Sequence, residues 1–559
     1  MSNSSNFLMN RRQILQAGAA IAGAAMLPWN EAAAQQAGPF IRYNVADPRG
    51  QKMLEGYATA IKNMLALDPS HRHHWYRFAF THFFDCPHGN WWFLVWHRAF
   101  TGYAERIVRK YSGMKDFAFP YWDWTASPEV PLSMYEGVLD PNNEAFIGSA
   151  ADFRSRMDRM FAKEEGKDNY WVMDPDPKGD YSGTRFSQLL SRSYRFPEDV
   201  WFDIFKNPNT VAFFGRGSAR GLKRDNRSLS NFVKNQVSQE AIEEALSPRD
   251  FETFSGGKTL NHHIMSTFGI LEGKPHNKVH NEVGGIVYTD AGEKTTNNGG
   301  FLQANLSPID PLFFLHHANI DRLWDVWTRT QKAAGGEYLP QGTDKTTWSE
   351  EPFLFFIDEN EGWAEKTKAG DYADISFFNY TYEDLPAQVS SKALVAAATS
   401  RKSQRREIQS VSSEPAESAA PAKADLGVPV TLPTTFLSVK RGLRKGPDAP
   451  LLFAKVTLGL PHAQRGAVFN ILIHAGDPAK ARVVDSVSLF GGHGGDHGPV
   501  TFTVAISKAL VALGGIPKDR TIYFQAAAAG EQKVQKGGAH DAGHGQATAS
   551  ALSVTVEEQ

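Results

Sequence analysis

The chain has 559 residues, a formal net charge of −2 and 42% hydrophobic residues. This length is too great for one ordinary hydrophobic core, so we expect more than one domain. The balance of charge gives no reason to expect a nucleic acid or a membrane surface as a partner, and the composition is ordinary for a globular protein.

Residues 1–34 are organised like an export signal. Arg11-Arg12 precede a mild apolar run that ends at Leu27, and the small residues Ala32-Ala33-Ala34 fit a cleavage site. The twin arginine indicates the bacterial Tat route. The apolar run is too short and too rich in Ala and Gly to predict a membrane-spanning helix. We therefore expect a periplasmic or secreted protein without stable membrane insertion.

A helix is predicted over residues 51–67, where apolar residues form a stripe at helical spacing. Asp47-Pro48 fits its cap and first-turn proline. Further along, the stretch between Ser127 and Leu260 is long, polar and rich in turn residues. It predicts loops and short helices around a helical core, and it offers no motif that we can assign.

Three histidines, His82, His88 and His97, fall within sixteen residues. His82 ends a predicted helical run from Trp75 to Phe84, and His97 lies inside a predicted helix from Trp91 to Tyr111. His88 comes from the loop that enters this second helix. Three neutral imidazoles from three backbone contexts can surround one copper, zinc, iron or nickel ion.

A second histidine group follows about 200 residues later. His276 and His280 are four residues apart and share one face of a helical turn. His316 and His317 lie about 100° apart around a predicted helix, so only one of them can point at a metal. The sequence therefore predicts two sets of three histidines, each able to hold one ion.

Several motifs around these histidines resemble the tyrosinases and polyphenol oxidases of the type 3 copper family. The matching segments are W-Y-x-x-A-x-x-H ending at His82, C-P-H-G at Cys86–Gly89, W-H-R at Trp96–Arg98, P-Y-W-D-W at Pro120–Trp124, H-N-x-V-H at His276–His280, D-P-x-F-F-L-H-H at Asp310–His317 and Y-x-Y at Tyr380–Tyr382. The resemblance implies a mainly α catalytic domain over residues 38–386, built as a four-helix bundle that holds two copper ions. It assigns one copper to His82, His88 and His97, and the other to His276, His280 and His317. It thereby selects His317 over His316.

The resemblance also implies roles for Glu272, Asn277 and Leu306. Glu272 and Asn277 match positions thought in this family to hold and polarise a water. A phenol has a pKa of about 10, so forming phenolate at pH 7 costs roughly 4 kcal/mol, which a positioned base can lower. Leu306 matches a gate position above the metals, where an aliphatic side chain leaves room for an aromatic ring.

Cys86 is the only cysteine, so an intrachain disulfide is excluded. It lies two residues before His88. In fungal-type relatives a cysteine in this place forms a thioether to the histidine, and the resemblance implies the same bond here. The alternative is a small buried thiol.

The composition changes after Pro386. Residues 387–426 are rich in Ser, Ala, Lys, Arg and Glu and predict a flexible linker open to an activating protease. Residues 427–559 predict a small antiparallel β-sandwich, because short apolar runs alternate with Gly-, Pro- and Asp-rich joints. The runs are Phe436–Lys440, Leu451–Gly459, Val468–His474, Val500–Ala505, Ile522–Ala526 and Leu552–Val556.

The segment Leu460–His462 resembles the C-terminal domain of plant polyphenol oxidases. In that family this domain covers the copper site and keeps the enzyme latent, and Phe453 is our candidate for the covering side chain. Four further histidines in Gly-rich loops are predicted to be solvent-exposed rather than copper-handling: His493, His497, His540 and His544.

These observations predict a latent, copper-dependent oxidase that uses O2 to hydroxylate monophenols at the ortho position and to oxidise o-diphenols to o-quinones. Its partners would be a small phenol, O2 and an activating protease; the oligomeric state is left open. A catechol oxidase or an o-aminophenol oxidase without monophenolase activity is an alternative. More distant alternatives are an oxygen carrier of the haemocyanin type and a structural or zinc-binding protein.

Overall fold

The computed structural model describes residues 38–161, 183–206, 214, 219–288, 294–296, 306–383, 409–412, 426–433, 451–459, 468–490, 498–528 and 550–559. Contacts divide the chain into two units, Met1–Pro39 and Phe40–Gln559, and all the described helices and strands belong to the second. The predicted export signal lies outside the described residues. Among the helices of the described segments, none has the length and apolar character needed to span a bilayer.

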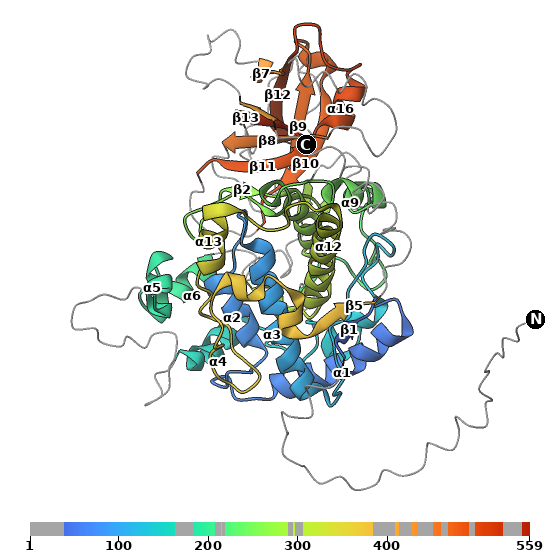
Figure 1. Cartoon of the computed structure of the whole chain (residues 1–559). Coiled ribbons are helices and arrows are strands. Elements are labelled where there is room, and N and C mark those ends of the chain that lie inside the picture. The colour runs from blue at the N-terminus through green and yellow to red at the C-terminus, as the bar shows by residue number, and fades with distance from the viewer. Residues whose placement is uncertain are drawn as a thin grey trace, which may run out of the picture. The chain divides into compact units, whose positions relative to one another are not determined.

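Four long helices form the framework of the N-terminal region (Figure 1): α1 (Pro48–Leu65), α2 (Tyr76–Asp85), α3 (Phe93–Ser112) and α12 (Leu312–Ala334). Asp47 caps α1 by accepting a hydrogen bond from the backbone N–H of Arg49, with Pro48 in the first turn. At the other end of α3, Gly113 takes a left-handed conformation with φ of 73°. The predicted helices are confirmed to within a few residues at each end.

Aromatic side chains join these helices into one core. The ring of Phe314 on α12 lies 5.3 Å from that of Phe78 on α2 and 5.6 Å from that of Phe100 on α3. Phe313 lies 5.8 Å from Phe100 and faces the histidines of both groups. Buried aromatic pairs of this kind contribute beyond their apolar area and hold the helices at fixed positions.

Short helices connect the long ones, as the sequence predicted between Ser127 and Leu260. Four of them begin at a Ser or Asp side chain that accepts a backbone N–H, which is why these polar segments still form helical turns. Their bounds, with those of two neighbours and of a later helix, are α4 (Ala150–Met157), α5 (Arg185–Ser191), α6 (Pro197–Lys206), α8 (Asn231–Gln236), α9 (Gln239–Ala245), α10 (Phe251–Ser255) and α13 (Gly342–Glu350).

The Y-x-Y motif closes the helical region against its first strand. Strand β5 (Tyr380–Tyr382) pairs in parallel with β1 (Phe40–Arg42). The hydroxyls of Tyr380 and Tyr382 both donate to the carboxylate of Asp321 on α12, which also pairs with Arg42 and Arg98. A buried carboxylate surrounded by these donors ties both ends of the region to the same helix.

The C-terminal region is built from antiparallel strands in two sheets, which confirms the predicted fold class. One sheet has the order β10-β9-β12-β7 and the other β2-β11-β8-β13-β6. The described strands of the C-terminal segment are β7 (Val428–Thr431), β8 (Leu452–Gly459), β9 (Val468–His474), β10 (Arg482–Ser488), β11 (Val500–Ala505), β12 (Thr521–Ala528) and β13 (Ser550–Glu558). The short helix α16 (Ser507–Ala512) lies between β11 and β12.

Two short strands of one sheet come from outside the predicted sheet domain. Within the predicted linker, β6 (Gln409–Ser412) pairs with β13, so at least this part is a strand of the sheet. Within the helical region, β2 (Thr267–Phe268) pairs in parallel with β11. Both short strands satisfy peptide groups that would otherwise stay unpaired at an edge of the sheet. The rest of 387–425 and the segments Phe436–Lys440 and Leu460–His462 lie outside the described residues.

Candidate metal centre

The first histidine group is assembled by α2, α3 and the loop between them. The Nε2 atoms of His82 on α2 and His97 on α3 are 3.4 Å apart. The ring of His88 lies 5.7 Å from that of His82 and 5.3 Å from that of His97. All three side chains are buried, and one nitrogen from each lies within 4.8 Å of the others.

Gly89 allows the loop to bring His88 into this group. Its φ is +63°, a conformation that L side chains rarely adopt, and an added Cβ would stand 2.9 Å from the side chain of Met265. Its backbone N–H donates to Glu272 at 3.0 Å. The turn after Pro87 therefore points the His88 ring inward before α3 begins.

The second group comes from the two helical segments around residues 276 and 316. A π-helical turn, η5 (Glu272–His276), runs directly into α11 (Asn277–Val283), so His276 and His280 fall on one face. The Nε2 atoms of His280 and of His317 on α12 are 3.1 Å apart. The rings of His276 and His317 are 5.0 Å apart, which completes the three-histidine set.

His316 lies in the same group, because all four ligand atoms of His276, His280, His316 and His317 fall within 4.8 Å of one another. The Nδ1 atom of His316 accepts a hydrogen bond from Trp124 Nε1 at 3.1 Å. The His317 ring instead stacks on His97 of the first group, with centroids 4.5 Å apart. Both histidines therefore bring a ring nitrogen to this group, contrary to the expectation that only one of them could. His317 also contacts the first group, whereas Nδ1 of His316 is occupied by Trp124.

The two groups adjoin and form one centre. Besides the stack of His97 on His317, the rings of His88 and His276 are 5.7 Å apart. Two buried three-histidine groups in contact are consistent with a dinuclear copper site.

The donor groups have the charge and spacing that metal binding requires. Burial lowers the pKa of His97 to about 3 and holds those of His276, His280 and His317 well below the ordinary value. Neutral imidazole is the ligand form. Two nitrogens bound to one ion at about 2.0–2.1 Å stand roughly 3.3 Å apart in a tetrahedral site, close to the separations described above. The residues present therefore fit a dinuclear metal centre.

Three hydrogen bonds fix the orientation of these rings through their Nδ1 atoms. His97 bonds the carbonyl of Phe93 at 2.8 Å, His276 bonds Asn277 Oδ1 at 2.8 Å, and His88 bonds Glu272 Oε1 at 3.0 Å. When Nδ1 carries the proton, Nε2 presents its lone pair to the centre. The partners of His97 and His276 are local, four residues away and one residue away in the chain, whereas the pairing of His88 with Glu272 depends on how a loop and a helix meet.

Glu272 and Asn277, predicted to hold a water, both lie at the centre. The two carboxylate oxygens of Glu272 accept from Gly89 N at 3.0 Å, and burial raises its pKa well above the ordinary value. Asn277 donates from Nδ2 to the carbonyl of Ser488 at 3.0 Å. The structure thus places each residue next to a histidine, Glu272 beside His88 and Asn277 beside His276.

The remaining predicted site residues are also buried. Leu306 is fully buried and begins the short helix η7 (Ser307–Ile309). Cys86 is a buried free thiol at the C-cap of α2, and burial raises its pKa to about 12. His493, His497, His540 and His544 lie outside the described residues.

Phe490, which follows β10, packs directly on the centre. Its ring stacks on His280 with centroids 4.1 Å apart and lies 5.5 Å from both His88 and His276. The candidate Phe453 lies on β8 and is fully buried. It packs in the core cluster of the helical region, whereas its neighbours Leu452 and Ala454 face the core of the sheets. Phe490, which comes from the end of a strand that the sequence did not predict, makes the ring contacts with the histidines.

Comparisons with known proteins agree with this centre. Residues 71–330 match the common central domain of tyrosinase. The chain is 27% identical over 304 residues to a chloroplastic polyphenol oxidase of Vitis vinifera, covering 54% of this chain and 37% of that protein. It is also 27% identical over 253 residues to a tyrosinase of Hahella sp. (strain CCB-MM4), covering 43% and 37%. The chain thus spans little more than a third of the length of these relatives.

Two solved structures are similar over most of the chain. A latent aurone synthase, described as a polyphenol oxidase, is 14% identical, with 93% of this chain and 86% of that chain covered and a TM-score of 0.46. A tyrosinase from Burkholderia thailandensis is 18% identical, with 88% and 95% covered and a TM-score of 0.47.

Proposed function

Because residues 71–330 carry the common central domain of tyrosinase, we propose that this chain is a copper-dependent oxidase of phenols. The single observation that carries the proposal is the pair of adjoining, buried three-histidine groups. His82, His88 and His97 would hold one copper ion, and His276, His280 and His317 the other. Two bound copper ions would supply the binding and reduction of O2.

We propose monophenol hydroxylation as well as diphenol oxidation, and this finer assignment rests on Glu272 and Asn277. Hydroxylation needs the phenol proton to be removed at the centre. Glu272 lies within 3.0 Å of the His88 ring, where a carboxylate can hold a water against an entering phenol. Asn277 orients His276, which belongs to the second histidine group. A catechol oxidase or an o-aminophenol oxidase would have less need for this base.

We further propose that the intact chain is a latent form. Phe490 occupies the face of His280 against which an aromatic substrate would have to stack. Three residues of α11 hold the strand end that carries it. Asn277 donates to the Ser488 carbonyl, and Lys278 and Asn281 donate to the Ser488 hydroxyl at 3.2 and 2.9 Å. Substrate entry therefore requires these contacts to break.

Copper content and activity on tyrosine and on a catechol, measured together, test the function. The expected result is two copper ions per chain and formation of quinone from both substrates. His280→Ala should lose about one copper and nearly all turnover, because His276 and His317 alone leave an incomplete set. His474→Ala, which changes a histidine on β9, is the matched control. Full copper occupancy and normal turnover in His280→Ala would refute the assignment of the second group.

A further inference from the structure

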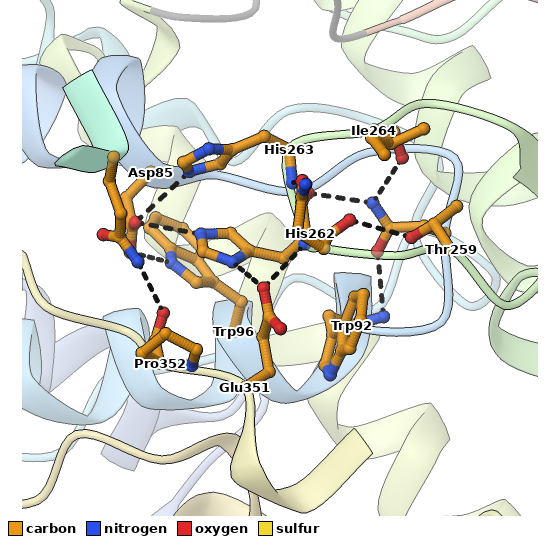
Figure 2. A network of polar contacts seen from close by, with 12 residues as sticks. Asp85, Trp92, Trp96, Thr259, His262, His263, Ile264, Glu351 and Pro352 are labelled. Atoms are coloured by element: carbon orange, nitrogen blue, oxygen red, sulfur yellow. Dashed lines mark hydrogen bonds and ion pairs between the residues drawn. The ribbon is translucent and has the colours of Figure 1, made fainter. Parts of the chain in front are cut away.

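A third group of potential ligands lies outside the dinuclear centre. Asp85 at the end of α2 and the consecutive residues His262 and His263 place one ligand atom each within 4.8 Å of the others. The Oδ1 atom of Asp85 is 3.0 Å from His262 Nε2 and 3.6 Å from His263 Nε2. Figure 2 shows both imidazole rings directed at this carboxylate. None of the three residues has a role in the proposed oxidation.

Each of the three residues makes a further hydrogen bond through its other polar side-chain atom. His262 Nδ1 bonds Glu351 Oε1 at 2.6 Å, His263 Nδ1 bonds Ser191 Oγ at 3.3 Å, and Asp85 Oδ2 accepts from Trp96 Nε1 at 2.7 Å. Proteins orient metal ligands in this way, with histidine donating its other ring proton to a carboxylate. Burial lowers the pKa of His262, but the carboxylates of Asp85 and Glu351 outweigh burial and raise that pKa above its ordinary value, so a metal ion bound at Nε2 displaces a proton.

The backbone that carries the two histidines is also held in place. Asn90 Nδ2 donates to the carbonyls of His262 and Ile264, both at 2.9 Å. The backbone N–H of His262 donates to Glu351 at 2.8 Å (Figure 2). The geometry of the group is therefore set by the loop and does not have to form when a ligand arrives.

One ring nitrogen in the group has no hydrogen-bond partner. His263 Nε2 is buried and stands beyond hydrogen-bond distance from Asp85. Burial and the nearby Arg192 guanidinium hold the pKa of His263 well below the ordinary value, so its ring is neutral and Nε2 presents a lone pair when Nδ1 carries the proton. A buried ring nitrogen without a partner is unfavourable, and a cation or a water in front of it would satisfy it.

We propose that Asp85, His262 and His263 bind a third metal ion, a divalent cation of the zinc type, separately from the dinuclear centre. Two imidazoles and one carboxylate are a donor set that zinc uses, with a further position left for water. The side chain of His263 is 9% exposed, so the ion has a path from the surface on that side. Bound there, the ion would join the end of α2 to the loop before β2 and to the residue that follows α13.

Zinc titration of the copper-loaded full chain tests this proposal. The expected result is one equivalent of Zn2+ bound per chain while copper, measured in the same samples by mass spectrometry, stays constant. His263→Ala should weaken this binding by at least about 100-fold. The matched control is His71→Ala, which removes a partly exposed histidine whose Nε2 lies 3.5 Å from Glu361, and it should bind zinc like the unaltered chain.

Glu351→Gln provides a second variant that keeps an acceptor oxygen near His262. Removing an outer hydrogen-bond partner of a metal ligand lowers affinity by roughly 10–100-fold, so an intermediate loss is expected. Co2+ as an alternative probe should give the visible absorption of a low-coordinate site in the unaltered chain and not in His263→Ala. Zinc uptake matched by copper loss, no uptake, or equal uptake in His263→Ala would each overturn the proposal.

Discussion

The contacts of Glu272 give it two possible roles, and a substitution can distinguish them. Its carboxylate accepts from Gly89 and meets His88 Nδ1, so it both fixes a ligand and supplies a base beside the centre. Glu272→Gln keeps an acceptor oxygen for the ring but removes the group that can take up a proton. We expect monophenol hydroxylation to fall at least about 10-fold more than diphenol oxidation, since general-base catalysis contributes roughly 10²–10⁴-fold. Steady-state rates on a matched monophenol and catechol, at equal copper content, measure the ratio.

Asn277→Asp is a second variant for comparison with Glu272→Gln. It keeps an oxygen for His276 Nδ1 and removes the donor to Ser488. If Glu272→Gln depresses both reactions equally, Glu272 acts only by orienting His88, and the base lies elsewhere.

Cys86 allows a covalent prediction that the copper content does not address. In the copper-loaded, active protein exposed to O2, the peptide that contains Cys86 and His88 should be lighter by two hydrogens, because the thioether replaces an S–H and a ring C–H and O2 takes up the two electrons and two protons. Tandem mass spectrometry of the digest measures this difference, and the copper-free chain is the control. Alkylation of Cys86 in fully active protein would exclude the bond and leave a buried thiol.

The histidines could be predicted from the sequence, whereas the orienting groups that are distant in the chain could not. His82, His88 and His97 are close in the chain, and His276 and His280 share a helical face, so spacing alone indicates their use. The partner of His88 stands 184 residues away in the chain. Asp85, His262 and Glu351 likewise meet only because α2, a loop and the end of α13 come together, and local sequence patterns carry no signal for such contacts.

At the scale of elements, the end of β10 is the critical contact between the sheets and the helices. Burial of a Phe side chain contributes about 1.5–3 kcal/mol. Phe490→Ala should therefore raise the fraction of molecules in which the centre is uncovered roughly 10-fold or more. Activity of the intact chain on a bulky phenol should rise accordingly, and more than activity on a small one. Phe490→Leu, which keeps much of the volume, should lie between. No gain with Phe490→Ala at equal copper occupancy would show that another element restricts entry.

The regular elements were predictable where the hydrophobic period was strong. The apolar runs of β8, β9, β11, β12 and β13 were identified, and so were the long helices that carry histidines. Strand β10 was missed because Asp485, Ser486 and Ser488 interrupt its apolar pattern, and these polar residues are buried against partners elsewhere. Strands β2 and β6 are two and four residues long and exist only because a neighbouring edge pairs with them.

The carboxylate of Glu244 on α9 makes a pH-dependent contact with the C-terminal region. Glu244 pairs with Lys274 at 2.8 Å and with Lys508 of α16 at 3.1 Å. Burial raises the pKa of Glu244, but these two ammonium groups outweigh burial and lower it below its ordinary value of 4.5. Its contribution to docking is therefore fully present above about pH 4.5 and is lost as the pH falls through the lowered pKa.

We therefore expect the activity of the intact chain, divided by that of Phe490→Ala at the same pH, to rise as the pH falls below 4.5. This ratio removes the intrinsic pH dependence of the reaction. A partly exposed ion pair contributes about 1 kcal/mol, so Glu244→Gln should raise the activity ratio a few-fold at neutral pH. The same change should make the ratio less dependent on pH. A ratio that is constant with pH in both proteins would assign no docking role to Glu244.

For the molecule as a whole, the two regions share an interface that is too continuous to separate by a single cut. Phe268 of β2 stacks on Phe502 of β11 with centroids 5.2 Å apart, and both are buried. The C-terminal Gln559 donates to Asp250 and Thr253 of the helical region. Strand β6 follows the basic residues Arg401–Arg406, so a tryptic cut there leaves β6 with its sheet.

We therefore expect trypsin to cut between Arg401 and Arg406 without releasing the C-terminal region, which should still co-elute with the helical region and keep most of its latency. Mild detergent added to the cut protein should then raise activity, mainly on bulky phenols. A chain ending at Pro386 should be active without detergent but less stable, because it exposes Phe268 and the unpaired edge of β2. If that chain gains no activity at equal copper occupancy, latency does not arise from the C-terminal region. If trypsin alone gives full activity, the buried contacts at Phe490, Phe268 and Gln559 are too weak to hold the regions together once the chain is cut.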